Sequence, residues 1–250
     1  GSTRAGVLVA KAAADTVKRV TQELGGKSPN IIFEDANLEK DVTAGVRRMM
    51  NNTGQSCNAP SRMLVQSSVY DQAIKIAKTA AEDIAVDQPT KEGEHLGPLS
   101  SRVQFDKVQG LIKKGIEEGA NVVAGGPGKP DGLDIGYFVK PTVFSGVSND
   151  MTIAQEEIFG PVLTMISFDT EEQAIEIAND TPYGLAAYFS TASEERAARV
   201  ASQLRAGMIS VNSASQNYTA PFGGYKQSGN GREWGEFGFD DFLEIKGITR

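Results

Sequence analysis

Segments with the apolar pattern of strands alternate with segments that have the pattern of helices along the whole chain. Helical periodicity covers residues 5–17, 38–50, 69–84, 102–118, 171–179 and 194–204. Strand-like runs cover residues 19–24, 30–33, 63–65, 121–123, 137–144, 162–168 and 208–211, with 242–248 as a candidate last strand. Such alternation predicts an α/β fold built on a mainly parallel sheet, because parallel strands need helical crossovers between them.

Composition limits the kinds of partner that this chain binds. The 250 residues carry a net charge of −7, and the basic residues are scattered, so we expect no nucleic-acid partner. No apolar stretch approaches the roughly 18 residues of a membrane span, so we expect no membrane partner. One cysteine excludes an internal disulfide framework, which fits a reducing compartment and predicts a cytoplasmic protein.

The single cysteine stands in the segment Gly54-Gln55-Ser56-Cys57, directly after a predicted helix. An isolated cysteine is more often a small buried hydrophobe than a reactive group. Here glycine and small polar residues frame it, which is the setting of a nucleophile. A free thiol has a pKa near 8.5, so it needs local help to ionise at neutral pH.

A second segment upstream, Glu23-Leu24-Gly25-Gly26-Lys27-Ser28-Pro29-Asn30, changes the interpretation of that cysteine. Alone, Glu23 would be an ordinary solvated residue at a strand end. Together the two segments resemble the aldehyde dehydrogenase family. The resemblance implies that Cys57 is the catalytic nucleophile and that Glu23 is the general base.

Residues 156–162, Glu-Glu-Ile-Phe-Gly-Pro-Val, resemble a further segment of that family. The match implies that Glu157 holds the ribose hydroxyls of the nicotinamide half of the cofactor and that Phe159 lines the nicotinamide. A carboxylate that accepts two hydroxyl donors suits a ribose. The alternative is a loop in which Gly160-Pro161 is ordinary turn punctuation.

Residues 221–229, Pro-Phe-Gly-Gly-Tyr-Lys-Gln-Ser-Gly, resemble the family segment that borders the substrate tunnel. The resemblance implies that Phe222 is an aromatic wall of the tunnel and that Asn212, after a late strand, lies near the active site. A glycine-rich turn with one packed ring is the alternative.

The first residues, Gly1-Ser2-Thr3-Arg4-Ala5-Gly6, resemble a turn that lies midway along full-length family members. The resemblance points to Ser2 as a pyrophosphate contact, because a helix amino terminus presents free N–H groups to phosphate. The alternative is that Gly1-Ser2 is vector sequence. Either way we expect a carboxy-terminal half of a family member.

The resemblance implies three parts and one activity. Residues 1–24 would be the end of a Rossmann-like dinucleotide-binding domain, 25–228 an aldehyde dehydrogenase-like catalytic domain, and 229–250 a return that pairs with another subunit. The parent would be a homodimer or homotetramer that oxidises a small aldehyde to a carboxylic acid with NAD or NADP, through a thiohemiacetal and a thioester. The half-chain alone is expected to be inactive.

Two other functions stay open at this stage. A CoA-acylating relative would resolve the thioester with a thiol, which Glu23 disfavours, and the chain could also be a non-catalytic structural or assembly module. A Cys57–His95 protease dyad is disfavoured, and no Cys/His cluster has metal-ligand spacing, so no metal is expected. The identity of the aldehyde and the choice between NAD and NADP are not readable from these residues.

Overall fold

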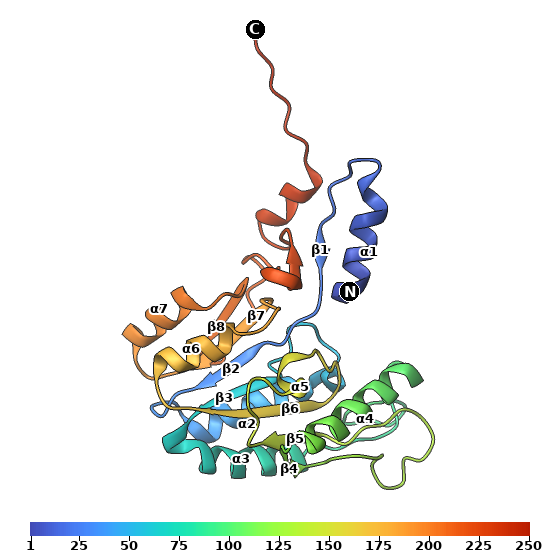
Figure 1. Ribbon diagram of the computed structural model, residues 1–250, viewed down its shortest axis with the longest axis vertical. Coiled ribbons are helices and arrows are strands. Elements are labelled where there is room, and N and C mark those ends of the chain that lie inside the picture. Colours follow the sequence, from blue (N-terminus) through green and yellow to red (C-terminus); the bar gives the residue numbers. More distant parts are fainter.

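A seven-stranded sheet with the order β4-β5-β6-β3-β2-β7-β8 organises the computed structural model, which describes residues 1–250 (Figure 1). Its strands are β2 (Pro29–Ile32), β3 (Arg62–Gln66), β4 (Asn121–Ala124), β5 (Thr142–Ser145), β6 (Val162–Phe168), β7 (Ala186–Ser190) and β8 (Met208–Val211). Only β4 is antiparallel to its neighbour, and all other pairs are parallel. The predicted α/β fold with a mainly parallel sheet is therefore confirmed.

Helices cover both faces of the sheet, which makes three layers. The helices are α2 (Leu38–Met50), α3 (Tyr70–Glu82), α4 (Arg102–Glu117), α5 (Thr152–Gln155), α6 (Glu171–Asn179) and α7 (Glu194–Gln203). Side chains of α2 and α3 share a core of 17 buried residues with Ile32 and Met63. Those of α4, α6 and α7 share the other core, of 24 buried residues, with Ile31 and Leu64. Successive strand residues thus face opposite cores, as the two-residue period of a strand requires.

Local capping explains why the helix starts were predictable. Asn37 caps α2 by accepting a hydrogen bond from the Lys40 N–H, as its position before the periodic segment predicted. Ser101, Thr170 and Ser193 cap α4, α6 and α7 in the same way. The helix that was predicted over 5–17 is α1 (Thr3–Ala14).

The two ends of the chain form a smaller unit beside the sheet. Figure 1 shows α1, β1 (Gln22–Glu23), β9 (Gly229–Asn230) and the 3-10 helix η4 (Phe237–Phe242) standing above it. We call this part the terminal unit. β1 pairs antiparallel with β9, so residues from both ends of the chain meet there. None of the helices combines the length and the apolar character that crossing a bilayer requires.

The strand predictions failed at four places. The strand expected over 19–24 shortens to β1, and the one expected over 137–144 is only β5, because Pro141 has no N–H to donate to a ladder. Residues 242–248 lie exposed without a strand partner. β7 was not predicted, because its run Ala186-Ala187-Tyr188-Phe189-Ser190 lacks the β-branched residues typical of strands. Short 3-10 turns, η1 (Asn51–Gly54), η2 (Ser67–Val69) and η3 (Lys226–Ser228), complete the chain.

Candidate active site

The predicted nucleophile, base and ribose carboxylate all lie on segments that lead into neighbouring strands. Glu23 precedes β2, Cys57 precedes β3 and Glu157 precedes β6, and these strands are adjacent in the order β6-β3-β2. Because the three strands are parallel, the segments before them reach the same edge of the sheet. We call this the amino edge. Open parallel sheets usually bind ligands at the carboxyl ends of their strands, and the amino edge is the opposite edge.

Cys57 stands on a loop whose backbone is forced into an unusual shape. After α2 ends, Asn52, Thr53 and Gly54 take φ values of 52°, 56° and 67°. At Gly54 a Cβ would overlap the carbonyl of Gly160, so only glycine fits. The loop that carries the thiol is therefore locked against the segment that follows Glu157.

The Gly25-Gly26 pair lies on the segment that leads into β2. It allows the Cys57 loop and the Glu157 turn to pack directly against that segment. A Cβ on Gly25 would overlap the Glu157 carboxylate, and a Cβ on Gly26 would overlap the Cys57 carbonyl. The Gly26 N–H donates to Glu157 Oε1 at 3.1 Å. The two glycines thus bring the predicted nucleophile and the predicted ribose carboxylate to one point.

Glu23 lies on β1, where the terminal unit meets the sheet. Both carboxylate oxygens are buried without a well-formed hydrogen bond, and the backbone of Gly224 is near enough to oppose the rise in the pKa of Glu23. Burial, together with the nearby Glu233 carboxylate, raises the pKa of Glu23 to about 7, while Arg232 opposes the rise. A carboxylate with a pKa in this range is suited to exchange protons at neutral pH.

The charges of the site act on Cys57. Burial raises the pKa of the Cys57 thiol, and the Glu23 and Glu157 carboxylates raise it further. The N–H groups of Asn58 and Cys57 act in the opposite direction. The thiol therefore keeps its proton at neutral pH until a base removes it. Glu23 is one of the two carboxylates near enough to affect the pKa of this thiol.

Two residues of α4 hold the Glu157–Phe159 turn, and sequence analysis missed both. Lys107 Nζ donates to the Glu157 carbonyl at 2.7 Å, and Gln104 Nε2 donates to the carbonyls of Ile158 and Phe159 at 2.9 Å and 2.8 Å. Phe159 itself has φ 57°. Their helical spacing places Gln104 and Lys107 on one face of α4, but nothing in the sequence connects that face with residue 157.

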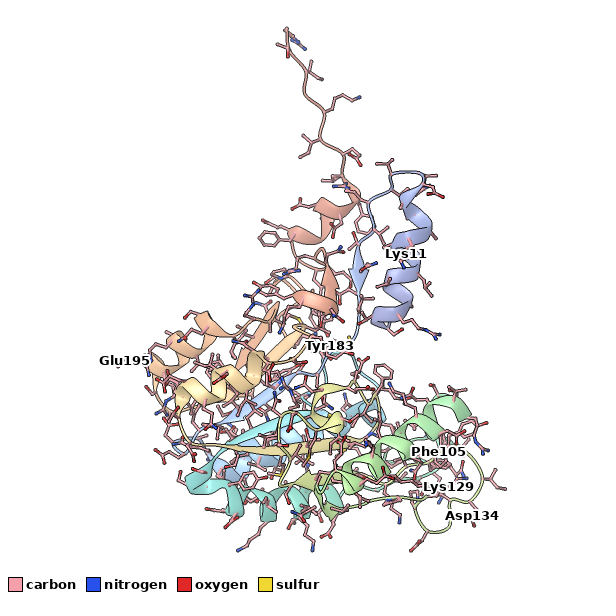
Figure 2. The ribbon with its side chains drawn as sticks, in the orientation of Figure 1. Lys11, Phe105, Lys129, Asp134, Tyr183 and Glu195 are labelled. Carbon is pink, nitrogen blue, oxygen red and sulfur yellow. The ribbon has the colours of Figure 1, made fainter.

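Tyr183 marks the junction between the sheet and the terminal unit (Figure 2). Burial raises the pKa of its hydroxyl, and the carboxylates of Glu157 and Glu156 raise it further. Tyr183 is thus a neighbour of the predicted cofactor carboxylate that the sequence did not indicate.

Two cations are buried behind the site. Arg62 is fully buried and donates to the carbonyls of Lys27, Ile177 and Ala178 and to Asn149 Oδ1, at 2.8–3.0 Å. Lys27 is 1 % exposed and its ammonium has no partner. Burial and the charge of Arg62 lower the pKa of Lys27 to about 7.

The remaining predicted residues are distributed between both parts of the molecule. Ser2 is the N-cap of α1 and accepts from the Ala5 N–H at 3.3 Å. Phe222 is 9 % exposed, on the segment 221–229, whose Ser228 carbonyl accepts a hydrogen bond from the Leu24 N–H, next to Glu23, at 3.0 Å. Asn212 follows the carboxyl end of β8, and its side-chain oxygen accepts from the Thr191 N–H at 2.9 Å. The structure does not bring Asn212 to the amino edge, so its predicted substrate role has no support from this geometry.

The fold and the arrangement at the amino edge define a class of protein, an α/β enzyme domain with a cysteine–carboxylate site. The model of the aldehyde dehydrogenase family matches residues 1–248. The chain belongs to the aldehyde dehydrogenase family.

Among its relatives is a 3-succinoylsemialdehyde-pyridine dehydrogenase from a Pseudomonas species, 57 % identical over 99 % of this chain and 52 % of the relative. An aldehyde dehydrogenase from Pseudomonas syringae, solved with NAD⁺ and octanal, is 52 % identical with a TM-score of 0.96, over 98 % of this chain and 50 % of that one. One from Bacillus cereus, solved with NAD⁺, is 44 % identical with a TM-score of 0.94, again over 98 % and 50 %. The chain thus spans about half the length of the relatives that it matches.

Proposed function

We propose that the whole protein that carries this chain oxidises an aldehyde to a carboxylic acid with NAD. The observation that supports this most strongly is the meeting of Cys57, Glu23 and Glu157 at the amino edge. A thiol, a base with a pKa of about 7 and a carboxylate for a ribose are the groups that the reaction needs.

The residues around Glu157 fit a nicotinamide riboside. One carboxylate oxygen is held by the Gly26 N–H, while Lys107 and Gln104 anchor the backbone of the turn. Glu157 would hold the ribose hydroxyls and Phe159 would line the nicotinamide, while Ser2, at the amino terminus of α1, would meet the pyrophosphate. When bound, the cofactor supplies a hydride acceptor. The NAD⁺ complexes of the similar enzymes support NAD over NADP.

The roles of the chain's own groups follow from their charges. Glu23 as carboxylate accepts the Cys57 proton, and the thiolate forms a C–S bond to the aldehyde carbon, giving a thiohemiacetal. Loss of a hydride from the former aldehyde carbon to the bound acceptor would leave the thioester, and Glu23 releases the proton taken from Cys57 to solvent, so that it is a carboxylate again. Glu23 then takes a proton from water, the resulting hydroxide adds to the thioester carbonyl, and the C–S bond breaks to release the acid and the Cys57 thiolate.

We also propose the organisation that the motifs imply. Residues 1–24 would end a dinucleotide-binding domain, 25–228 would form the catalytic domain and 229–250 would pair with another subunit in a homodimer or homotetramer. The exposed apolar side chains of the last segment, such as Phe242 and Ile245, support such pairing. The acidic composition and the single cysteine support a cytoplasmic location.

The activity is tested by incubating the whole protein with NAD and a panel of alkyl and aryl aldehydes. We expect NADH and the matching acid in equal amounts, and an acyl group on the Cys57 peptide in mass spectra of a quenched reaction. The proposal is wrong if no aldehyde yields NADH, or if the acyl group is found on another residue.

The 250-residue chain alone should not turn over aldehydes. It spans half of its relatives, and the resemblance puts most of the dinucleotide-binding sheet outside it. Isothermal titration with NAD should show little binding to this chain and normal binding to the whole protein. Clear micromolar binding by the 250 residues would contradict the half-enzyme interpretation.

A further inference from the structure

Trp234 stands at a strained position in the terminal unit, and the proposed mechanism does not use it. It follows an isolated antiparallel bridge in which Phe222 and Glu233 exchange two N–H···O bonds of 2.7 Å. Directly after that bridge, Trp234 takes φ 65°, which is rare for a bulky residue. Strained residues of this kind persist where the surrounding structure holds them, and they gather at functional sites.

Trp234 is the middle ring of an aromatic cluster that we call the ring triad: Tyr218, Phe222 and Trp234. Its ring centroid is 4.6 Å from that of Phe222, with 42° between the planes, and 5.0 Å from that of Tyr218, with 51°. Phe222 is 9 % exposed and Tyr218 is 67 % exposed. The triad therefore runs from Phe222 in the protein interior to Tyr218 at the surface, and the Tyr218 ring keeps free area.

The ring triad lies beside the predicted base. Glu233, next to Trp234, is near enough for its charge to act on Glu23. Arg232 Nη1 donates to the Gly224 carbonyl at 3.1 Å, which ties the two arms of the bridge together. Gly229–Asn230, which precede Arg232 in the chain, pair directly with β1, which carries Glu23. The rings thus lie on the two arms of the bridge whose neighbouring residues pair with the strand that carries Glu23.

Aromatic faces distinguish a flat ring from a flexible chain. Tilted or offset ring pairs add an electrostatic attraction to the burial of apolar area, and an alkyl chain gains only the burial. Ligand sites are commonly lined by such rings, with few polar groups. A triad that is held rigid by a backbone bridge needs no reordering to accept a ring.

We propose that Trp234 is a specificity-determining residue, and that the ring triad selects aldehydes that carry a flat aromatic ring over straight-chain aldehydes. This rests on the proposed aldehyde oxidation by the whole protein. Phe222, which the family resemblance already implies as a tunnel wall, is positioned by Trp234 from one side, while Tyr218 extends the surface towards solvent.

The kinetic test compares pyridine-3-carbaldehyde with hexanal in the whole protein. Trp234→Leu should lower kcat/KM for the pyridine aldehyde about tenfold, mainly through KM, and change hexanal less than about twofold. Tyr218→Ala, at an exposed position, should lower kcat/KM for the pyridine aldehyde by about threefold. Trp234→Phe, which keeps an aromatic ring, should retain most of the wild-type kcat/KM for that aldehyde. Phe239→Leu is the matched control, because that exposed ring has no aromatic partner. Equal losses with both aldehydes in the two triad variants, or no loss with either, would overturn the proposal.

A binding test separates this proposal from the activity. Trp234 is the only tryptophan of the 250-residue chain, so fluorescence excited selectively in tryptophan reports on the middle ring of the triad. Pyridine-3-carboxylate should quench it with a saturable dependence that Tyr218→Ala weakens, and hexanoate should not. If the whole protein oxidised no aldehyde, the proposed activity would fail, and this titration would still decide the ring preference. Linear quenching, or equal effects of both acids, would contradict it.

Discussion

The amino edge of the sheet and the terminal unit contribute to the same site, but they differ in how tightly their side chains are packed. At the amino edge, Arg62 is completely buried and bonded to four acceptors, and Gly26 and Gly54 lock the backbone of the Cys57 loop. In the terminal unit, apolar side chains such as Leu8 and Phe242 are exposed by 59 % and 85 %. Close packing fixes the side chains and loops of the amino edge, whereas the terminal unit leaves many of its apolar side chains exposed.

The raised pKa of Glu23 is a chemical consequence of this difference in packing. It belongs to the terminal unit through β1, but its oxygens are enclosed where that unit meets the sheet. Burial of the carboxylate, together with the charge of Glu233, raises the pKa of Glu23 to about 7. The proposed general base therefore lies at the junction of the two regions, and its pKa depends on both of them.

The largest effect is expected at the amino edge, from Cys57→Ser in the whole protein. A hydroxyl is far less ionised and less nucleophilic than a thiol, so turnover should fall by about 1,000-fold or more. Steady-state NADH formation measures the loss, and Ser56→Ala, at the neighbouring residue, is the control that should keep most activity. Near-normal turnover of the serine variant would remove Cys57 from the mechanism.

Glu23→Gln tests the base that the junction creates. An amide cannot take a proton from Cys57 or from water, so the NADH burst should be slower than in wild type, the acyl-enzyme should accumulate after it, and the steady-state rate should be lower by roughly 100-fold. Stopped-flow absorbance separates the two phases. In wild type, deacylation should rise as the pH passes through about 7, because Glu23 is ionised only above its pKa. Unchanged steady-state turnover in Glu23→Gln, or a deacylation rate in wild type that does not depend on pH, would show that Glu23 is not the general base.

The packed nature of the amino edge is tested by Gly54→Ala. Alanine at φ 67°, with its Cβ against the Gly160 carbonyl, should lower the free energy of unfolding by about 3 kcal/mol. Gly110→Ala is the matched control, because Gly110 lies within α4 and nothing stands within 4 Å of its Cβ position. That change should stabilise by about 0.5–1 kcal/mol. Urea unfolding measures both, and equal effects would show that the loop is not locked.

The smallest expected effect is a change in how stability depends on pH. Folded Lys27 loses its proton above about 7, whereas unfolded Lys27 keeps it up to 10.5. Between these values the unfolded chain binds more protons, so the free energy of unfolding contributed by Lys27 rises with pH. Lys27→Met should flatten that rise and stabilise the protein at pH 7, by on the order of 2 kcal/mol.

Denaturant unfolding at pH 7 and pH 9 measures this slope. Lys75→Met, at an exposed position of α3, is the control and should leave the slope unchanged. If Lys27→Met and Lys75→Met gave the same pH dependence, Lys27 would not be a buried amine with a lowered pKa.

Local patterns determined most of the elements and marked the candidate reactive residues in this sequence. The period of 3.6 residues and the cap at Asn37 place α2, and the apolar run 162–168 is β6 over its full length. These signals work because capping and periodicity involve residues a few positions apart. Cys57 and Glu23 stood out because their neighbours form short motifs, and their roles came from the family resemblance alone.

Only the tertiary structure decided which of these residues meet. The strand order β6-β3-β2 brings Glu157, Cys57 and Glu23 to one edge, and the same order leaves Asn212 beyond the carboxyl end of β8. The support of Glu157 by Lys107, and the stacking of Trp234 on Phe222, join segments that no periodic pattern connects. The physical reason is that burial, charge coupling and strand order depend on contacts between distant parts of the chain, which local propensity does not encode.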